Sequence, residues 1–200
     1  MATPRMRALQ MTVALLWIAA VALAAAEERM AAPPADWYLE HNDFLARDGG
    51  IFHADNSAYR SEDEPWDTYG LAWEKGPSGQ TLRGRLFALR DGEDAGTFFE
   101  YFIFWHPAER KAFIYQVSGD GTLGVAELEP PAADGTQRTE ASFSGPDGSS
   151  SRVAHVARSQ GDTHSTESFD WVDGTWKPRR TYLWHRVQAQ ERTDARSPRS

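Results

Sequence analysis

A regular succession of short strand-like runs is the feature that most constrains this chain. From Asp67 onward, runs of eight to ten residues rich in β-branched and aromatic side chains alternate with short segments rich in glycine, proline and aspartate. The runs are Asp67–Lys75, Thr81–Arg90, Thr97–Trp105, Lys111–Ser118, Thr122–Glu129, Thr136–Ser144, Ser151–Ser159, Asp162–Trp171 and Pro178–Val187. Because the separators have hairpin length, consecutive strands are expected to be neighbours in an antiparallel meander.

Such a meander closes into a barrel or folds into a sandwich, and the run Thr97–Trp105 favours the barrel. Its sequence, TFFEYFIFW, is aromatic on both faces, whereas a strand with one wet face alternates apolar and polar residues. A filled interior on one side and a packed helix on the other would cover both faces. We therefore predict an all-β, antiparallel up-and-down barrel of about 8–10 strands with a short N-terminal helix, with a sandwich as the alternative.

The predicted helix precedes the strands. Trp37–Ala46 carries apolar residues at helical spacing, and Gly49 and Gly50 stop it. We expect this helix to pack on the outside of the barrel. The acidic segment from Ile51 to Pro65 is predicted to be irregular.

The ends of the chain indicate an exported protein with one domain. Two arginines precede the 16-residue apolar run Met11–Ala26, which ends in alanines and is shorter than the roughly 20 residues that a membrane span needs. We predict a signal peptide over 1–26, a linker over 27–36, a single barrel domain over 37–187 and a disordered tail over 188–200. The expected location is periplasmic or secreted, with no membrane span after cleavage.

Composition excludes some functions and disfavours others. The chain has no cysteine, which excludes disulfides, thiolate zinc sites and cysteine nucleophiles. Its 29 acidic and 21 basic residues give a net charge of −8, and signal cleavage would remove two of the arginines. An acidic surface repels nucleic acid, so no nucleic-acid partner is expected. The sequence leaves the oligomeric state open.

Several short motifs occur along the predicted strands. They are Trp66-Asp67-Thr68-Tyr69-Gly70, Leu82-Arg83-Gly84-Arg85, Trp105-His106-Pro107 with Lys111 and Phe113, and Asp173-Gly174 followed by Trp176, Arg179 or Arg180, Tyr182, Trp184 and Arg186. Together these motifs resemble the lipocalin-like, or calycin, barrels found among uncharacterised bacterial exported proteins. The resemblance implies a barrel with a ligand cavity and assigns no reaction. The chain departs from secreted lipocalins by lacking their disulfides and a clear opening G-x-W motif.

The stretch GDTHSTESFDW, residues 161–171, holds four acidic or histidine side chains, which the strand pleat divides between two faces. The face that ends in Phe169 and Trp171 is expected to point inward, and it carries Glu167. A buried carboxylate needs a partner, and Arg179, Arg180 or His155 on flanking strands could supply one. Glu167 is therefore either half of a structural ion pair or a polar anchor in a ligand cavity. Asp162, His164 and Asp170 would lie outside.

His155 is expected to face inward from Ser151–Ser159. Such a histidine is a satisfied core residue, an acid/base group or an iron ligand. Haem would need one inward histidine, for which His155, His164 and His185 are the in-strand candidates. No metal site is expected, since neither His-x-His nor an i, i+4 histidine pair on a helix occurs.

The remaining candidate ligand-binding residues are Glu100, Tyr115, Trp105 and Tyr182, with Arg180 as a cationic contact. The leading hypothesis is an exported barrel that binds a small apolar or amphipathic molecule in an aromatic-lined cavity. A second hypothesis is an enzyme that uses Glu167 or His155 as acid/base. No catalytic residue is assigned, because nucleophile-elbow and phosphate-loop motifs are missing. A haem-binding barrel and a filled structural module are two further hypotheses.

Overall fold

The computed structural model describes residues 33–77 and 79–188. It contains ten strands, one α-helix and two short 3-10 helices, η1 (Arg47–Gly49) and η2 (Ser57–Tyr59). The helix is α2 (Asp36–Ala46). The strands are β1 (Ile51–Asp55), β2 (Thr68–Lys75), β3 (Thr81–Arg90), β4 (Glu93–His106), β5 (Lys111–Ser118), β6 (Leu123–Leu128), β7 (Thr136–Ser144), β8 (Ser150–Gln160), β9 (Thr163–Val172) and β10 (Thr175–Arg186).

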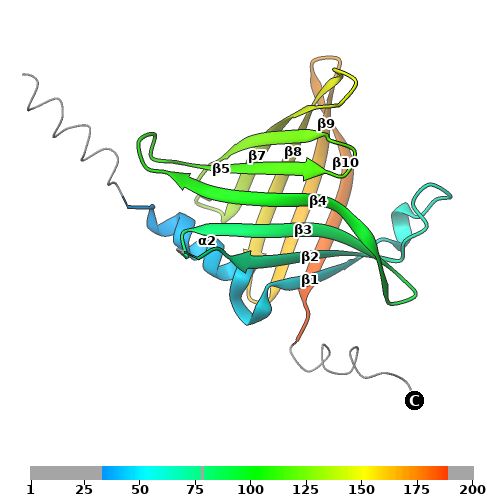
Figure 1. The fold of residues 1–200 in the computed structure, drawn as a ribbon, viewed down its shortest axis with the longest axis horizontal. Helices are drawn as coiled ribbons and strands as arrows, with labels where there is room; N and C mark the ends of the chain where they lie inside the picture. Colours follow the sequence, from blue (N-terminus) through cyan, green and yellow to red (C-terminus); the bar gives the residue numbers. More distant parts are fainter. Residues whose placement is uncertain (1–32, 78, 189–200) are drawn as a thin grey trace, which may run out of the picture.

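The strands form one closed antiparallel barrel (Figure 1). Each strand pairs with the next in sequence, and β1 closes the ring by pairing with β10 through Phe52 and His53. Glycines that reverse the chain with positive φ, such as Gly92 and Gly174, let the hairpins turn tightly. The predicted all-β up-and-down barrel with a short N-terminal helix is therefore confirmed.

The strand β1 was missed by the sequence prediction, which treated Ile51–Pro65 as irregular. Phe52 and Ala54 of this five-residue strand are buried, while Ile51, His53 and Asp55 face outward. The apolar–polar alternation is present but too short to stand out beside an acidic loop. Its role is topological, because β1 joins β2 to β10 and so removes the edges of the sheet.

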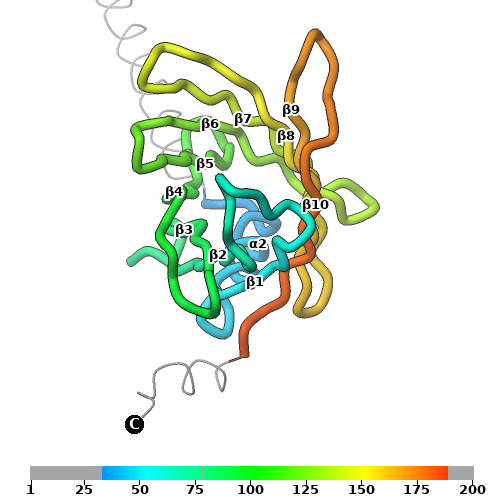
Figure 2. Tube along the Cα trace, turned by 90° about the vertical axis from the view of Figure 1, so that its right-hand side faces the viewer, coloured from blue at the N-terminus to red at the C-terminus, as the bar shows by residue number. Residues whose placement is uncertain are grey.

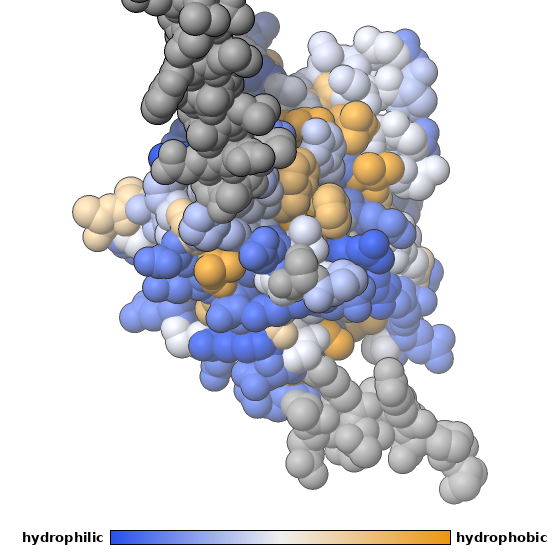
Figure 3. Space-filling view, turned by 60° about the vertical axis from the view of Figure 1, so that its left-hand side comes forward, coloured by the Kyte–Doolittle hydropathy of each residue, from blue (hydrophilic) through white to orange (hydrophobic). Residues whose placement is uncertain are grey.

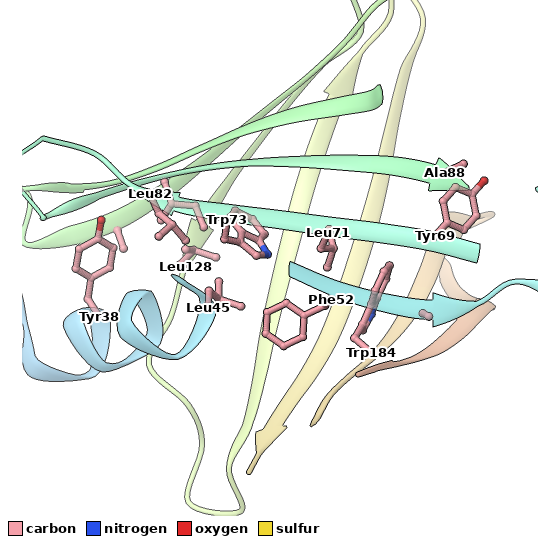
Figure 4. Packing of buried hydrophobic residues seen from close by; sticks show 13 residues of the cluster. Tyr38, Leu45, Phe52, Tyr69, Leu71, Trp73, Leu82, Ala88, Leu128 and Trp184 are labelled. Carbon is pink, nitrogen blue, oxygen red and sulfur yellow. The ribbon is translucent and has the colours of Figure 1, made fainter. Parts of the chain in front are cut away.

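Helix α2 closes one end of the barrel and does not cover its outer wall, so the expectation of an external helix was wrong. Tyr38 and Leu45 are buried and point toward Leu82 and Leu128 of the barrel (Figure 4). The Tyr38 hydroxyl donates to the Gln80 carbonyl at 2.6 Å. The helix therefore acts as a plug, and the core is densest directly above it.

The core beside α2 is formed by fully or nearly buried apolar side chains from β1 to β6 and from β10. They include Phe52, Leu71, Trp73, Leu82, Ile103, Ala112, Leu128 and Trp184. Trp73 lies flat on Gly84, where a Cβ would come within 2.3 Å of the indole ring. A glycine is thus required there for the aromatic ring to lie against the neighbouring strand.

The opposite end of the barrel is crossed by the loop 56–67, which joins β1 to β2. Figure 2 shows this loop, with η2, lying across the ring formed by the strands. Asn56, fully buried at its start, donates to the Trp66 carbonyl at 3.2 Å. On the other side, the Tyr59 hydroxyl accepts from the Thr181 amide of β10 at 2.8 Å. We call this end of the barrel the mouth.

The outward face of β4 is open to solvent, which explains its double aromatic pattern differently from the prediction. Phe102 keeps 40% of its surface exposed and stacks on Phe104, which packs in turn against Phe113 and Tyr115 of β5. Figure 3 shows hydrophobic side chains gathered on one part of a largely hydrophilic surface. No helix covers this aromatic surface in the described part of the chain.

The predictions for the chain ends fall largely outside the described residues. The signal peptide 1–26, most of the linker 27–36 and the tail from residue 189 onward are not described. Among residues 33–77 and 79–188, no helix is long and apolar enough to cross a membrane.

Candidate functional site

The register of β8, β9 and β10 decides which side chains enter the barrel. Trp184 of β10 is buried and pairs with His164, so the even-numbered residues of β9 point inward. His155 pairs with Ser168 across β8 and β9 and therefore shares this inward face. On β10, Tyr182 and Arg180 follow Trp184 inward toward the mouth.

Glu167 lies on the outer face and is exposed, so its predicted inward position was wrong. The prediction placed Phe169 and Trp171 in the core, yet both belong to the outer wall. Trp171 packs edge-on against Trp176, and the Arg152 guanidinium lies 4.9 Å from its ring centroid. Because aromatics cover this part of the outside, the apolar face of β9 was not the inner face.

Because even-numbered residues of β9 point inward, His164 and Asp170 also face the interior, whereas the sequence prediction placed both outside. His164 is buried beside α2, and its Nδ1 lies 2.9 Å from the Ser159 hydroxyl. Asp170 is partly buried near the mouth, where its carboxylate lies 3.4 Å from Arg179. Asp162 remains exposed, as expected.

Glu100 and Tyr115 also lie on the outer wall and do not line the interior. Glu100 is exposed and pairs with Arg85 and Val117, both of which face outward. Tyr115 is 38% exposed and stacks on Phe104. The inward residues of these strands are Tyr101 and Gln116 and their same-parity neighbours, since neighbouring residues alternate between the two faces.

Trp105 points inward but lies at the α2 end, far along the strand from the mouth. Its ring centroid is 5.7 Å from that of Tyr38 and 6.4 Å from that of Trp37. Trp105 and Trp37 line an open cleft of about 770 Å³ between the helix start and the β4–β5 and β6–β7 turns. This cleft is separate from the residues at the mouth.

Although inward Tyr69, Ala88, Gln116, Ala141 and Val153 are buried, several other inward side chains between the middle of the barrel and the mouth are partly exposed. On β3, β4 and β5 they are largely apolar and aromatic: Leu86, Phe99, Tyr101 and Ile114. On β7, β8 and β9 they are largely polar: Thr139, His155, Thr166 and Ser168. Phe143 of β7 also points inward, and its ring packs edge-on against Phe99 with the centroids 6.2 Å apart. We call these sets the aromatic wall and the polar wall of the lumen.

The two walls face each other. In the ring order, β4 lies five strands from β9, and β3 lies five strands from β8. In a ten-stranded ring, strands five apart are on opposite sides. The partly exposed inward side chains are thus apolar on one side and hydrogen-bonding on the other, an arrangement that suits an amphipathic molecule.

His155 is the central residue of the polar wall, with Thr139 and Ser168 directly across from it on the flanking strands. Burial, with a smaller contribution from the Arg179 guanidinium, lowers the pKa of His155 to about 4, against the opposing effect of Asp170. The imidazole is therefore neutral at neutral pH. Neither ring nitrogen has a hydrogen-bond partner among the described residues.

Arg180 and Tyr182 lie at the mouth within a hydrogen-bonded network. Both terminal nitrogens of Arg180 bind the Glu64 carboxylate, and the Arg180 Nη1 lies 3.3 Å from the Tyr182 hydroxyl. Tyr69 donates to the same carboxylate at 2.9 Å. Tyr182 donates to Asn56 at 2.8 Å. The guanidinium holds the pKa of Glu64 below its usual range, and burial followed by the bond to Glu64 raises the pKa of Tyr69 to about 12.

His155, Arg180 and Tyr182 were predicted as site residues and all point into the barrel, but several of their neighbours were not predicted. Ser168 and Thr139 could have been found from the register once the inward parity was known. Glu64 could not, because it belongs to a loop that was considered irregular, and 116 positions separate it from Arg180.

The described residues contain no group of three or more histidine, cysteine or acidic side chains arranged to hold a metal ion. Of the three histidines considered for haem, only His155 faces the lumen with unpaired nitrogens. His164 is bonded to Ser159 under the helix, and His185 is exposed on the outer face.

No family model matches this chain, and no curated protein resembles it at a significant level. The closed ten-stranded barrel is consistent with the lipocalin-like resemblance of its motifs.

Proposed function

We propose that this protein is an exported barrel that binds a small amphipathic molecule in its lumen, entering from the mouth. One observation carries the proposal: inward side chains above the core keep exposed surface and divide into an aromatic and a polar wall. In a barrel that served only as a filled module, inward residues such as His155, Ser168 and Leu86 would be buried, whereas here they are partly exposed.

In this proposal the apolar body of the ligand lies against Leu86, Phe99, Tyr101 and Ile114. Burying apolar surface there stabilises the complex by roughly 25 cal/mol per Å². His155 accepts a hydrogen bond from a ligand hydroxyl or amide, because its imidazole is neutral and unpaired.

A lumen-blocking substitution tests the proposal. Ala157 points inward next to His155 and is partly exposed, whereas its neighbour Val156 points outward beside Glu167. We expect Ala157→Phe to weaken binding of an apolar fluorescent probe, pyrenebutanol, at least about tenfold. Val156→Phe adds a ring to the outer wall of the same strand and should leave binding unchanged. Equal affinities in both variants, or no binding by the wild type, would remove the proposal.

Native mass spectrometry of protein purified from its own host would identify the ligand class. A retained small molecule of constant mass that is lost in Ala157→Phe would connect it to the lumen. The mass of the purified chain would also show which residue is its amino terminus after export, and thereby test removal of the predicted signal peptide 1–26.

A second candidate is haem ligation or acid/base chemistry by His155, favoured by its unpaired imidazole in the lumen. A Soret band in protein reconstituted with haem, absent in His155→Ala and retained in His185→Ala, would support ligation. Glu167 takes no part in either reaction, because it lies on the outer wall.

A further inference from the structure

The Arg180 site at the mouth has the donor arrangement of a carboxylate-binding site. The planar guanidinium fork of arginine matches the two oxygens of a carboxylate, and it stays charged at every accessible pH. Here the fork binds both oxygens of Glu64, while the Tyr69 hydroxyl adds a third donor at 2.9 Å. Tyr59 packs against the guanidinium, with its ring centroid 5.3 Å from Cζ.

The carboxylate in this site comes from the loop 56–67 rather than from the barrel wall. The side chains of Glu64 and Arg180 retain 27% and 23% of their surface exposed, so solvent and solutes can reach the pair. The loop also contacts β10 through Tyr59, which bonds Thr181 and packs on Tyr182, and through Asn56, which accepts from the Tyr182 hydroxyl. Among the ion pairs of the described residues, Glu64–Arg180 is the one that joins the loop to β10.

We propose that Arg180 takes the carboxylate of an amphipathic ligand, and that Glu64 occupies this position only in the free protein. This inference rests on the proposed function, since the ligand's body lies in the same lumen. The exchange keeps Arg180 paired, which matters because a partly buried charge without a partner is costly. The released Glu64 carboxylate is hydrated by water, so one charge-assisted contact replaces another.

The exchange has a direction because the ligand brings apolar surface with it. Glu64 loses its contact with Arg180 when the ligand binds. The ligand's apolar body gains contact with the aromatic wall, which begins near the mouth at Phe99 and Leu86. A neutral ligand of the same shape gains the wall contact but cannot replace Glu64. The site therefore selects acids over neutral molecules, and binding of an acid releases the loop.

A pair of matched probes tests this inference. Pyrenebutyrate and pyrenebutanol share an apolar body and differ in the carboxylate. Glu64→Gln removes the internal competitor, so we expect it to raise the affinity for pyrenebutyrate about tenfold and to leave pyrenebutanol unchanged. Arg180→Gln should lower pyrenebutyrate binding to the level of pyrenebutanol. Glu62→Gln, which changes an exposed acid of the same loop, should behave like the wild type.

The outcomes separate the two proposals. If both probes bind all variants with equal affinity, the carboxylate site is overturned while lumen binding stands. If neither probe binds the wild type or Glu64→Gln, lumen binding fails and the carboxylate site fails with it. Circular dichroism of Arg180→Gln establishes that the variant folds, and Glu64→Gln provides the test if it does not.

Release of the loop has its own readout. Arg60 lies in the loop, where it is paired with Asp67 at 2.6 Å, and offers a trypsin site. Saturating pyrenebutyrate should accelerate cleavage after Arg60, whereas pyrenebutanol should not. Cleavage that pyrenebutyrate leaves unchanged or slows would contradict the exchange.

Discussion

Acidification should loosen the end of the barrel that α2 closes, and protonation of buried His164 is one cause. The residue is only 7% exposed, and its imidazole is hydrogen-bonded to Ser159. It packs against the Phe44 and Phe52 rings at 6.0 and 6.3 Å. Burial, with smaller effects of His41 and Arg186, lowers the pKa of His164 to about 4.

The charged groups around His164 make protonation unfavourable. The Arg186 guanidinium lies over the Phe52 ring at 4.3 Å and donates to the Phe44 carbonyl. His41 on α2 is a second buried base, and burial lowers its pKa to about 4 as well. Asp162, two residues before His164 in the sequence, is engaged by Arg47 and Arg186 and is largely exposed.

The magnitude follows from the difference between the folded and unfolded pKa. His164 titrates near 6.5 in the unfolded chain and near 4 in the fold, so its neutral form stabilises the protein fully above about pH 6.5. Stability falls as the pH drops from there toward 4. At about pH 5 the loss amounts to about 2 kcal/mol, and it approaches about 3 kcal/mol below pH 4. This is a sizeable part of a typical domain stability of about 5–15 kcal/mol.

Urea unfolding at a series of pH values checks this prediction. The wild type should lose about 2 kcal/mol more between pH 7 and pH 5 than His164→Gln, which keeps a hydrogen-bonding side chain but does not titrate. His185→Gln, on the exposed face of β10, should retain the full pH dependence. If His164→Gln and the wild type lose stability in parallel, His164 is not the acid-sensitive group.

Two further predictions concern packing in the barrel wall. Gly124→Ala should destabilise the protein by about 1–3 kcal/mol, because its Cβ would lie 2.4 Å from the Phe143 ring, whereas Gly119→Ala meets no atom within 4 Å and should be tolerated; equal melting temperatures would refute the close approach. Ile103→Ala should cost about 2–5 kcal/mol and Phe102→Ala far less, since the first is buried inside the barrel and the second is 40% exposed outside. A reversed order of unfolding free energies would mean that the inward parity of β4 is wrong.

The barrel itself was predictable because the residues that specify its strands and turns are close together in the sequence. Turn residues such as Gly92 and Gly174 mark the hairpins, and the runs between them set the strand lengths within a few residues. The short strand β1 was not predictable in the same way. Its pairing with β10 joins the two ends of the domain, and the sequence of five residues does not indicate which strand will be the partner.

The direction in which each side chain points was harder to predict, because the apolar face of a strand is usually assumed to be the inner face. On β9 the rule failed: the inner face carries His164, Thr166 and Ser168, while the outer face carries Phe169 and Trp171. A lumen that is polar on one side reverses the pattern that a filled core would produce. The misplacement of Glu167 follows directly from this reversal.

In the proposed function, a ligand enters from the mouth and fills the lumen above the core. Because the chain has no cysteine, single cysteines report on it directly. Ser168→Cys on the polar wall should react with a small methanethiosulfonate within about tenfold of the rate of Glu167→Cys on the outer wall, and pyrenebutyrate should slow only the former. A Ser168→Cys thiol that stays unreactive until the protein unfolds, or that reacts equally fast with and without the probe, would contradict the claim.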